Sequence, residues 1–460
     1  MSGLDYTFTV EHIGERFKES ELSITDNHTN ETLTIQIIVN DKQLPLLNYQ
    51  ALPALLSDLI DLAVAVHLAD RLGKKHGRMP RSLAEMPRHI LLRLPVRTHE
   101  RLNTPYVREK LRDILYWFTE DFWSFEFLPY ERWGRSTQTQ LILPFLSPSI
   151  PTAKTALWSG GLDAFAGAFQ QLLADDTTHY TLFGTGSNGY MNKVQVKTAY
   201  ALAELFPGRT NLVQLPFGLK DTSNEARKSS SMRSRGFVFL LLGAVCAYQE
   251  GQDTLYVHEN GIGAINLPFR KSEVGVDHSR SVHPLSLRSM GELLSTIFEQ
   301  KFSFKNPFLF WTKAQMCKEL LTNHVAAQVF ATVSCDRRHR ASVMQCGYCS
   351  SCLLRRQAIA VHSDSDGTGY QITDSVSRKL KREDATHYRA MLAQVEDMKA
   401  LLAAPDSWRK MARHYKTLMD IMENGDEPQE RTQTQILHLY QRYVYEWEYI
   451  KERIGPEFLE

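Results

Sequence analysis

Two clusters of residues in this 460-residue chain have the types and spacing that chemistry needs. The first is Ser159-Gly160-Gly161-Leu162-Asp163, which follows an apolar segment and precedes a helical one. Glycines let a backbone approach an anion closely, and the N–H groups at the start of a helix point toward it. Ser159 adds a hydroxyl donor, and Asp163 suits Mg²⁺, which prefers carboxylates together with substrate phosphates. The pentapeptide therefore predicts a phosphate-binding loop, with a tight strand-to-helix turn as the structural alternative.

Four of the six cysteines form the second cluster, at positions Cys335, Cys346, Cys349 and Cys352. Two Cys-x-x-Cys steps share Cys349, and Cys335 supplies a fourth thiolate. Zinc takes four such ligands tetrahedrally, which closes the site to chemistry and makes it structural. The spacing therefore predicts a zinc site. An iron–sulfur cluster, also held by cysteine thiolates, is the alternative metal centre, and unrelated buried cysteines are the alternative without a metal.

The bulk composition is that of a globular protein, with 43% hydrophobic and 23% charged residues. The net charge of +1 gives no support to a nucleic-acid or membrane surface. No apolar run reaches the ~18–20 residues of a membrane span, and the N-terminus lacks the pattern of a signal peptide. We therefore expect a cytoplasmic protein, in which crowded thiols bind a metal instead of forming disulfides.

Residues 151–365 alternate strand and helix patterns, which is typical of a parallel sheet covered by helices. Strands are expected at Thr155–Trp158, Tyr180–Phe183, Thr210–Leu215 and Thr254–Val257, and helices at Phe165–Leu173, Val194–Phe206 and Phe237–Glu250. The predicted phosphate loop lies between the first strand and the first helix, so its N–H groups enter a helix N-terminus.

Residues 1–150 are predicted to form an accessory α/β domain that carries no catalytic motif. Its expected elements are strands at Thr32–Val39, Ile90–Pro95 and Thr139–Leu143, and a helix at Leu52–Leu72. Its aromatic cluster is expected to pack in the core: Trp117, Phe118, Phe122, Trp123, Phe125 and Phe127. Ser147–Pro151 is a linker candidate.

Residues 366–460 are predicted to form a helical extension. Three apolar stripes at helical spacing begin near Tyr388, Trp408 and Ile436, and Gly455-Pro456 ends the last one. These three amphipathic helices must bury their faces on the α/β body or on a partner.

The pentapeptide differs from the Gly-x-x-x-x-Gly-Lys-Ser/Thr loop that serves γ-phosphate transfer. It resembles the PP-loop of ATP pyrophosphatases, which adenylate a substrate and release pyrophosphate. That family usually has Ser-Gly-Gly-x-Asp-Ser, whereas this chain has Ala164 at the last position and so lacks one hydroxyl.

The loop and the cysteines in this order resemble the 7-cyano-7-deazaguanine synthase (QueC) family. The cysteine segment reads Ser334-Cys335, then Cys346-Gly-x-Cys349-x-x-Cys352-Leu-x-Arg355. Ser234-Arg235-Gly236-Phe237 looks like that family's second nucleotide-side segment, and Lys313 looks like its lysine before the zinc region. The resemblance covers roughly residues 153–362.

The resemblance implies an α/β PP-loop fold that activates 7-carboxy-7-deazaguanine, or a similar carboxylate, as an acyl-adenylate. An amine then attacks, giving an amide, a nitrile or a conjugate. ATP, Mg²⁺ and Zn²⁺ are the implied cofactors, and Ser159, Asp163 and Lys313 are the implied catalytic residues. Arg233 and Arg235 are candidate phosphate contacts because guanidinium groups suit phosphates. For both arginines, a solvated basic turn is the alternative.

The chain departs from the family in its presumed substrate segment and in its length. Residues 258–266 replace the usual segment, and Glu259 and Asn260 either bind a purine-like edge or cap a turn. The long N-terminal part and the helical tail resemble the QueC-like proteins of bacterial anti-phage operons, of Qat and some CBASS types. There the amine is expected to belong to a protein from the same operon, which these two segments would select; completing the fold or self-association is the alternative.

Two other functions remain open on the sequence. A tRNA-modifying PP-loop enzyme would need a nucleic-acid surface, which the net charge of +1 does not favour. A non-catalytic nucleotide-binding scaffold is favoured by Ala164, because the lost hydroxyl weakens the loop.

Overall fold

The structure is a computed structural model. It describes residues 3–12, 20–47, 52–73, 87–130, 153–220, 233–269, 280–322, 325–336, 344–371, 385–424 and 428–454. The strand expected at Thr139–Leu143, the linker at Ser147–Pro151 and the Gly455-Pro456 stop lie outside these residues.

Five parallel strands form the half of the sheet that carries the predicted phosphate loop. They are β6 (Lys154–Leu157), β7 (Tyr180–Gly186), β8 (Thr210–Leu219), β9 (Thr254–Tyr256) and β10 (Ser303–Lys305), in the order β8-β7-β6-β9-β10. The chain thus winds outward in both directions from β6. In such a sheet ligands bind at the carboxyl ends of the strands where the order reverses, here between β6 and β9.

Helices cover both faces of this parallel half, as the sequence predicted. One face carries α4 (Leu162–Ala174) and α5 (Gly189–Leu205), and the other carries α6 (Arg235–Gln249) and α8 (Pro284–Phe298). β7 is buried at all but its last position, which is typical of a parallel strand covered on both sides. The four strands and three helices expected here are confirmed; β10 is too short to give a sequence pattern.

The N-terminal half of the sheet combines antiparallel and parallel strands. It contains β1 (Tyr6–His12), β2 (Ser20–Asp26), β3 (Glu31–Val39), β4 (His89–Val96) and β5 (Phe122–Pro129), together with η1 (Leu44–Leu46), α1 (Ala54–Leu72), α2 (His99–Leu102) and α3 (Pro105–Thr119). Alternate residues of β5, namely Trp123, Phe125 and Phe127, are buried and pack in the core as predicted. Phe122 does not, because it lies on the other face of the strand and is 46% exposed.

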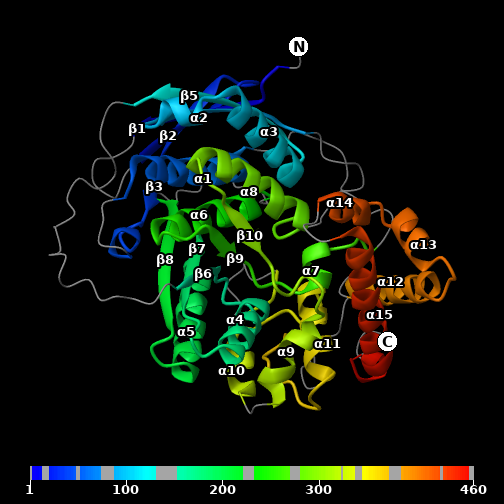
Figure 1. The fold of residues 1–460 in the computed structure, drawn as a ribbon. Helices are drawn as coiled ribbons and strands as arrows, with labels where there is room; N and C mark the ends of the chain where they lie inside the picture. The colour runs from blue at the N-terminus through cyan, green and yellow to red at the C-terminus, as the bar shows by residue number, and fades with distance from the viewer. Residues whose placement is uncertain are drawn as a thin grey trace.

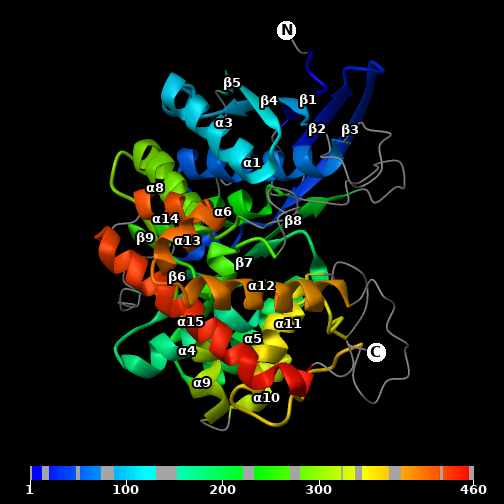
Figure 2. The same ribbon diagram turned by 90° about the vertical axis from the view of Figure 1, so that its right-hand side faces the viewer.

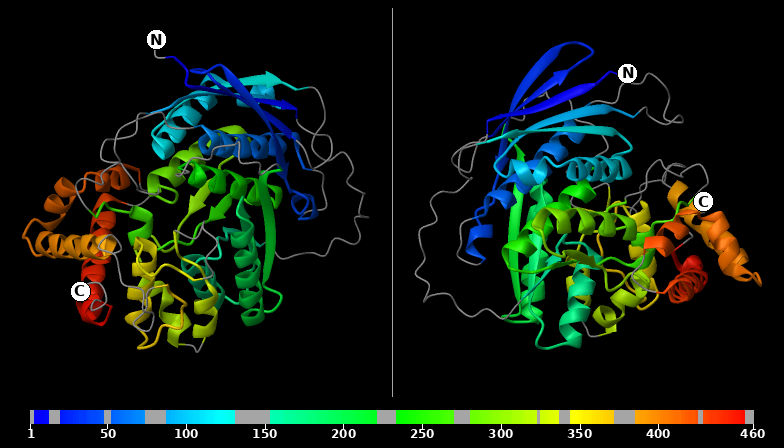
Figure 3. Two further views of the ribbon diagram at one scale, coloured as in Figure 1. Left: turned by 180° about the vertical axis from the view of Figure 1, so that it is seen from behind. Right: turned by 45° about the horizontal axis from the view of Figure 1, so that its top comes forward.

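The two halves form one continuous ten-stranded sheet, because β3 pairs antiparallel with β8. Ile37 lies opposite Leu219, and Val39 lies opposite Phe217. α1 lies between the N-terminal strands and α6 (Figure 1) and is buried at almost every position. A single apolar cluster therefore runs from the N-terminal strands to one face of the parallel half. Figure 3 shows from two other sides how the N-terminal strands and helices lie over the parallel half.

The helical extension lies against the cysteine region. It contains α12 (Thr386–Leu402), α13 (Ser407–His414), α14 (Thr417–Asn424) and α15 (Gln429–Ile454). The second apolar stripe, expected as one helix, is two helices, because Tyr415 leaves the helical conformation (φ −114°, ψ 83°) and buries its ring. α15 packs on α12 and on α11 (Ser350–Ala360), as Figure 2 shows. These helices share one apolar core with α7 (Gly261–Ile265) and the cysteines.

Two further short helices, α9 (Lys313–Thr322) and α10 (Ala326–Ala331), connect the parallel sheet to the cysteine region. Within the ranges given above, no helix combines the length and apolar content that crossing a bilayer requires.

Candidate active site and metal centre

The predicted phosphate loop leaves the carboxyl end of β6 and enters α4. Gly160 has φ of +75°, and a side chain on it would begin 2.9 Å from Val194 Cγ1, so only glycine fits there. Gly161 is the N-cap of α4, and no side chain caps its amides. The Gly161 N–H donates to the exposed Ser159 Oγ at 3.1 Å. The loop therefore presents a hydroxyl and an uncapped helix N-terminus on the ligand side of the sheet.

The loop is held from the side by the segment that leads to the first cysteine. The Val333 N–H donates to the Gly160 carbonyl oxygen at 3.1 Å. Because Val333 lies two residues before Cys335, the geometry of the loop depends on the cysteine region.

Asp163, whose side chain is partly buried, forms an ion pair with the buried Lys313. Lys313 Nζ donates to Asp163 Oδ2, and the lysine side chain is only 6% exposed. On the other carboxylate oxygen, Asn260 Nδ2 donates to Asp163 Oδ1 at 3.0 Å. The same amide nitrogen donates to Glu259 Oε1 at 2.7 Å. Residues that follow β6, follow β9 and begin α9 thus meet at the point where the strand order reverses.

The charges in this cluster shift one another. Burial disfavours the ammonium form of Lys313, but the charges of Asp163 and Glu259 outweigh it and raise the pKa of the lysine. Burial, and then the nearby Asp163 charge, raise the pKa of Glu259 to about 8. Near neutral pH, Glu259 is therefore mainly protonated. The ion pair of Lys313 is with Asp163.

Asn260 has a clear structural role, which supports the turn-capping reading of this residue. Its side-chain oxygen accepts a hydrogen bond from the Gly263 N–H at 3.0 Å and so caps α7. Its amide group is occupied by Asp163 and Glu259. Whether Glu259 or Asn260 contacts a purine-like ring stays a prediction.

The structure separates the two arginines that were candidates for phosphate contacts. Arg233 Nη1 donates to Glu120 Oε2 at 2.7 Å, so the carboxylate of Glu120, which follows α3, already neutralises the charge of this arginine. Arg235 begins α6, and its guanidinium carbon lies 5.0 Å from the centre of the Phe239 ring. Unlike Arg233, Arg235 forms no ion pair with a described residue; burial lowers its pKa, and the charge of Asp336 opposes this shift.

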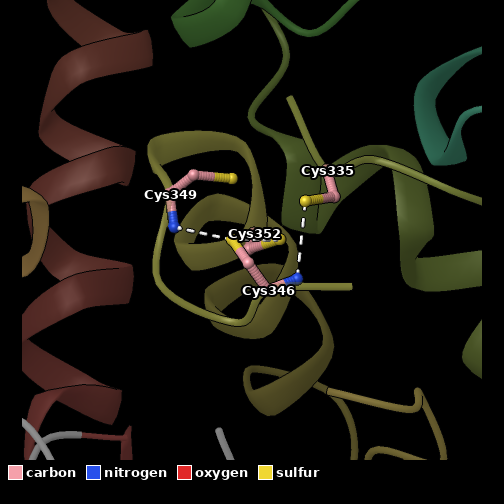
Figure 4. A group of neighbouring side chains, drawn as sticks. All are labelled: Cys335, Cys346, Cys349 and Cys352. Atoms are coloured by element: carbon pink, nitrogen blue, oxygen red, sulfur yellow. Dashed lines mark hydrogen bonds between the residues drawn. The ribbon is translucent and has the colours of Figure 1, made fainter. Parts of the chain in front are cut away.

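The four cysteines come together as predicted (Figure 4). Their sulfur atoms all lie within 4.8 Å of one another, and the Sγ atoms of Cys346 and Cys352 are 3.8 Å apart. A tetrahedral zinc with bonds of about 2.3 Å would place its sulfurs about 3.8 Å apart. The Cys346 N–H donates to Cys335 Sγ at 3.4 Å, and the Cys349 N–H donates to Cys346 Sγ at 3.3 Å. Thiolates accept such bonds in metal knuckles, so the site fits zinc.

Two buried charged residues join the segments that surround the site. The sequence did not predict their structural roles. Arg355 is fully buried and donates to Thr332 Oγ1 at 2.8 Å and to the Val329 carbonyl oxygen at 2.7 Å, which fixes α11 to the segment leading to Cys335. Glu446 of α15 accepts hydrogen bonds from Thr312 Oγ1 at 2.6 Å and Gln357 Nε2 at 2.9 Å.

The sequence contained a signal for Glu446. It lies three residues after Tyr443 and one before Trp447, on the apolar stripe of the last helix, where an acidic residue is out of place. Its partner Thr312 precedes Lys313 directly, so the helical extension contacts the start of the helix that bears the lysine.

His258 belongs to the core instead of the ligand surface. Its ring packs edge-on against Tyr180 and Phe308, and a side chain at Gly167 would begin 2.5 Å from the His258 Cβ. Burial lowers the pKa of His258 to about 4 and keeps it neutral. Gly167 thus lets α4 lie directly against the end of β9.

Residues 208–362 match the family model described as queuosine biosynthesis protein QueC. The match covers about a third of the chain. It includes Lys313 and all four cysteines, and it begins after the phosphate loop. No curated protein matches the chain.

Proposed function

Because this chain is QueC-like over residues 208–362 and has the α/β fold of a PP-loop protein, we propose that it is an ATP-dependent ligase. It adenylates 7-carboxy-7-deazaguanine, or a similar carboxylate, and transfers the acyl group to an amine. The observation that carries the proposal is the buried Asp163–Lys313 pair beside the phosphate loop, where β6 and β9 end. A structural turn alone would have no need of such a pair.

The reaction has two steps that balance. The carboxylate oxygen attacks the α-phosphate of ATP, which forms an acyl-adenylate and releases pyrophosphate. The amine nitrogen then attacks the acyl carbon, AMP leaves with the former carboxylate oxygen, and a proton is released. Adenylation is needed because a free carboxylate is a poor electrophile.

The position of each residue gives it a separate role in the proposed reaction. The backbone of residues 159–163 and the Ser159 hydroxyl bind the phosphates, as a loop at a helix N-terminus is suited to do. Asp163 would hold Mg²⁺, which supplies stabilisation of the phosphate charge. The Lys313 ammonium group pairs with Asp163 in the absence of ATP, and it pairs with the phosphate oxygens when ATP is bound. Cys335, Cys346, Cys349 and Cys352 would hold zinc in a structural site, which fixes the loop through Val333.

The amine acceptor is proposed to be a protein, and the biological role anti-phage defence. The support is indirect: the N-terminal half of the sheet and the helical extension add large surfaces around a QueC-like segment. An acceptor protein needs roughly 800 Å² of such surface for a stable complex, whereas ammonia needs only a channel.

The test is to incubate the purified protein with ATP, Mg²⁺ and 7-carboxy-7-deazaguanine, with either ammonia or the operon's other proteins, and to analyse the products by mass. We expect AMP, pyrophosphate and a deazaguanine-sized adduct on a protein. Asp163→Ala should abolish AMP formation while circular dichroism stays unchanged. ATP binding without AMP would favour the non-catalytic scaffold, and a modified tRNA would favour the tRNA-modifying enzyme.

A further inference from the structure

The N-terminal helix α1 reaches the ligand edge of the parallel sheet. Arg71, in its last turn, donates from Nη1 to Ser187 Oγ at 3.5 Å, and His67 Nε2 lies 3.4 Å from the same oxygen. Ser187 follows β7 directly, and β7 is the neighbour of β6, from which the phosphate loop leaves. Side chains from the N-terminal half of the sheet therefore lie one strand away from the loop.

Arg235 reaches the same place from α6. Its guanidinium packs on the Phe239 ring, and Phe239 Cζ lies 3.6 Å from where a side chain on Gly186 would begin. After burial itself, the charges of Arg71 and Arg235 are the causes that lower the pKa of His67, to about 3. The three groups thus share one region at the carboxyl end of β7.

This region carries positive charge that the described residues do not neutralise. Among the parts of the chain that the structure describes, no carboxylate forms an ion pair with Arg71 or Arg235, although Asp336 attracts Arg235 from further away. Burial lowers the pKa of both arginines. Half-buried cations without an anionic partner are costly, and an anion from outside would remove that cost.

We propose that Arg71 and Arg235 form a second anion-binding subsite at the carboxyl end of β7, which binds phosphate groups of the nucleotide held by the loop. The inference rests on the proposed function, because it takes ATP as the ligand. Neighbouring strands are about 4.8 Å apart, so a polyphosphate spans the distance between the loop after β6 and a subsite after β7. Guanidinium groups bind phosphate oxygens two at a time.

The subsite assigns a direct role to the N-terminal half of the sheet. α1 contributes Arg71 to the nucleotide site, in addition to extending the sheet through β3 and β8. The QueC-like segment, which begins at residue 208, contains Arg235 and lacks Arg71. The nucleotide site is therefore incomplete without the residues that precede the segment.

The test is calorimetric titration of the full-length protein with ATP and, separately, with inorganic tripolyphosphate. Arg71→Ala should weaken the binding of both ligands at least tenfold, and Arg71→Lys should weaken it less. The control is Arg112→Ala, which removes the same charge from an exposed position on α3 of the same half and should leave both affinities unchanged. If Arg71→Ala has a lowered melting temperature, Arg71→Gln, which can still donate to Ser187, takes its place.

The outcomes separate this inference from the proposed function. If the unmodified protein binds ATP and forms AMP, and both Arg71 variants bind ATP and tripolyphosphate equally well, the subsite is wrong and the proposed function stands. A change confined to the KM of the carboxylate substrate would also overturn the subsite. If the unmodified protein binds neither ligand, both proposals fail together.

Discussion

Asp163 and Lys313 are 150 positions apart in the chain and yet share a buried contact. A buried ion pair gives little net stability, because removing two charges from water costs about as much as their attraction returns. Nothing in the local fold requires it: α4 begins without a side-chain cap, and α9 has its own cap at Thr312. The pair is therefore better explained by the proposed reaction than by folding.

The raised pKa of Glu259 predicts that the stability of the protein depends on pH. Burial raises its pKa from an ordinary 4.5 to about 8, so the folded protein binds its proton more tightly than the unfolded chain does. The stability that this group contributes is fully present below about pH 4.5 and is lost as the pH rises through about 8. Glu259→Gln keeps an oxygen for Asn260 to donate to and cannot ionise.

We therefore expect Glu259→Gln to raise the melting temperature at pH 8 and to leave it nearly unchanged at pH 5. Thermal unfolding at these two pH values measures the shift in melting temperature, with Glu204→Gln, at an exposed position of α5, as the matched control. An equal shift at both pH values would show that Glu259 is ionised in the folded protein.

At the scale of residues, the sequence predicted the positions of residues that belong to a motif. The loop at residues 159–163 joins a strand to a helix, the four cysteines lie together as their spacing indicated, and Lys313 contacts the loop aspartate. Arg71 could not be found in this way. Its contact with Ser187 depends on β3 pairing with β8, which no local pattern in either strand announces.

The start of α9 is the element that connects the helical extension to the site. Thr312 and Gln315 cap it reciprocally: the Gln315 N–H donates to Thr312 Oγ1 at 3.2 Å, and the Thr312 N–H donates to Gln315 Oε1 at 2.9 Å. The Thr312 hydroxyl also donates to Glu446 of α15 at 2.6 Å. α15 therefore fixes the helix whose first residue is Lys313.

Removing this connection should lower the rate without weakening substrate binding. In Glu446→Ala we expect kcat to fall about tenfold or more with KM for ATP nearly unchanged, because a small displacement of a catalytic group is costly. Steady-state AMP formation measures both constants. Glu452→Ala, at an exposed position of the same helix, is the control. An unchanged kcat would show that α15 only completes the fold.

The cysteine knuckle, formed by Cys335, Cys346, Cys349 and Cys352, predicts the metal content of the purified protein. The purified protein should contain one zinc per chain, and Cys349→Ser should lose it together with solubility, because zinc-binding energy is folding energy. Elemental analysis and thermal unfolding measure these quantities, with Ser351→Ala on the same knuckle as a control that keeps all four thiols. Iron with visible absorbance would assign the site to an iron–sulfur cluster instead.

Elements with a regular pattern were predictable, and those set by distant contacts were not. β7 and α6 are buried at most positions and begin within two residues of where the sequence predicted them. The break between α13 and α14 follows from the burial of the Tyr415 ring, which depends on α15. β10 has only three residues and forms because β9 offers it a free edge.

Across the whole molecule, a buried network joins the two halves of the sheet. Arg88 Nη2 donates to Asp70 Oδ1 at 2.6 Å and to Asp121 Oδ2 at 2.5 Å. The other oxygen of Asp70 accepts from the Ser234 N–H at 2.8 Å, at the start of α6. The carboxylate of Asp70, from α1, thus caps the N-terminus of α6, the helix that carries Arg235.

Loss of the Asp70 carboxylate should lower the free energy of unfolding of both halves of the sheet together. Breaking a buried pair from one side costs about 3–5 kcal/mol, since the remaining charge stays buried. We expect that loss of unfolding free energy for Asp70→Ala in a denaturant titration, in one cooperative transition. Asp113→Ala, at an exposed position of α3, should change it by less than about 0.5 kcal/mol. Two separate transitions would show that the halves fold independently.

The central claim, that a carboxylate is activated by adenylation, is tested most directly by following an oxygen atom. The protein is supplied with ATP, Mg²⁺, an amine and 7-carboxy-7-deazaguanine labelled with ¹⁸O in its carboxylate, and the nucleotide products are examined by mass spectrometry. The account predicts AMP carrying one ¹⁸O, released together with pyrophosphate and absent with Asp163→Asn. Unlabelled AMP, or ADP with inorganic phosphate, would contradict it.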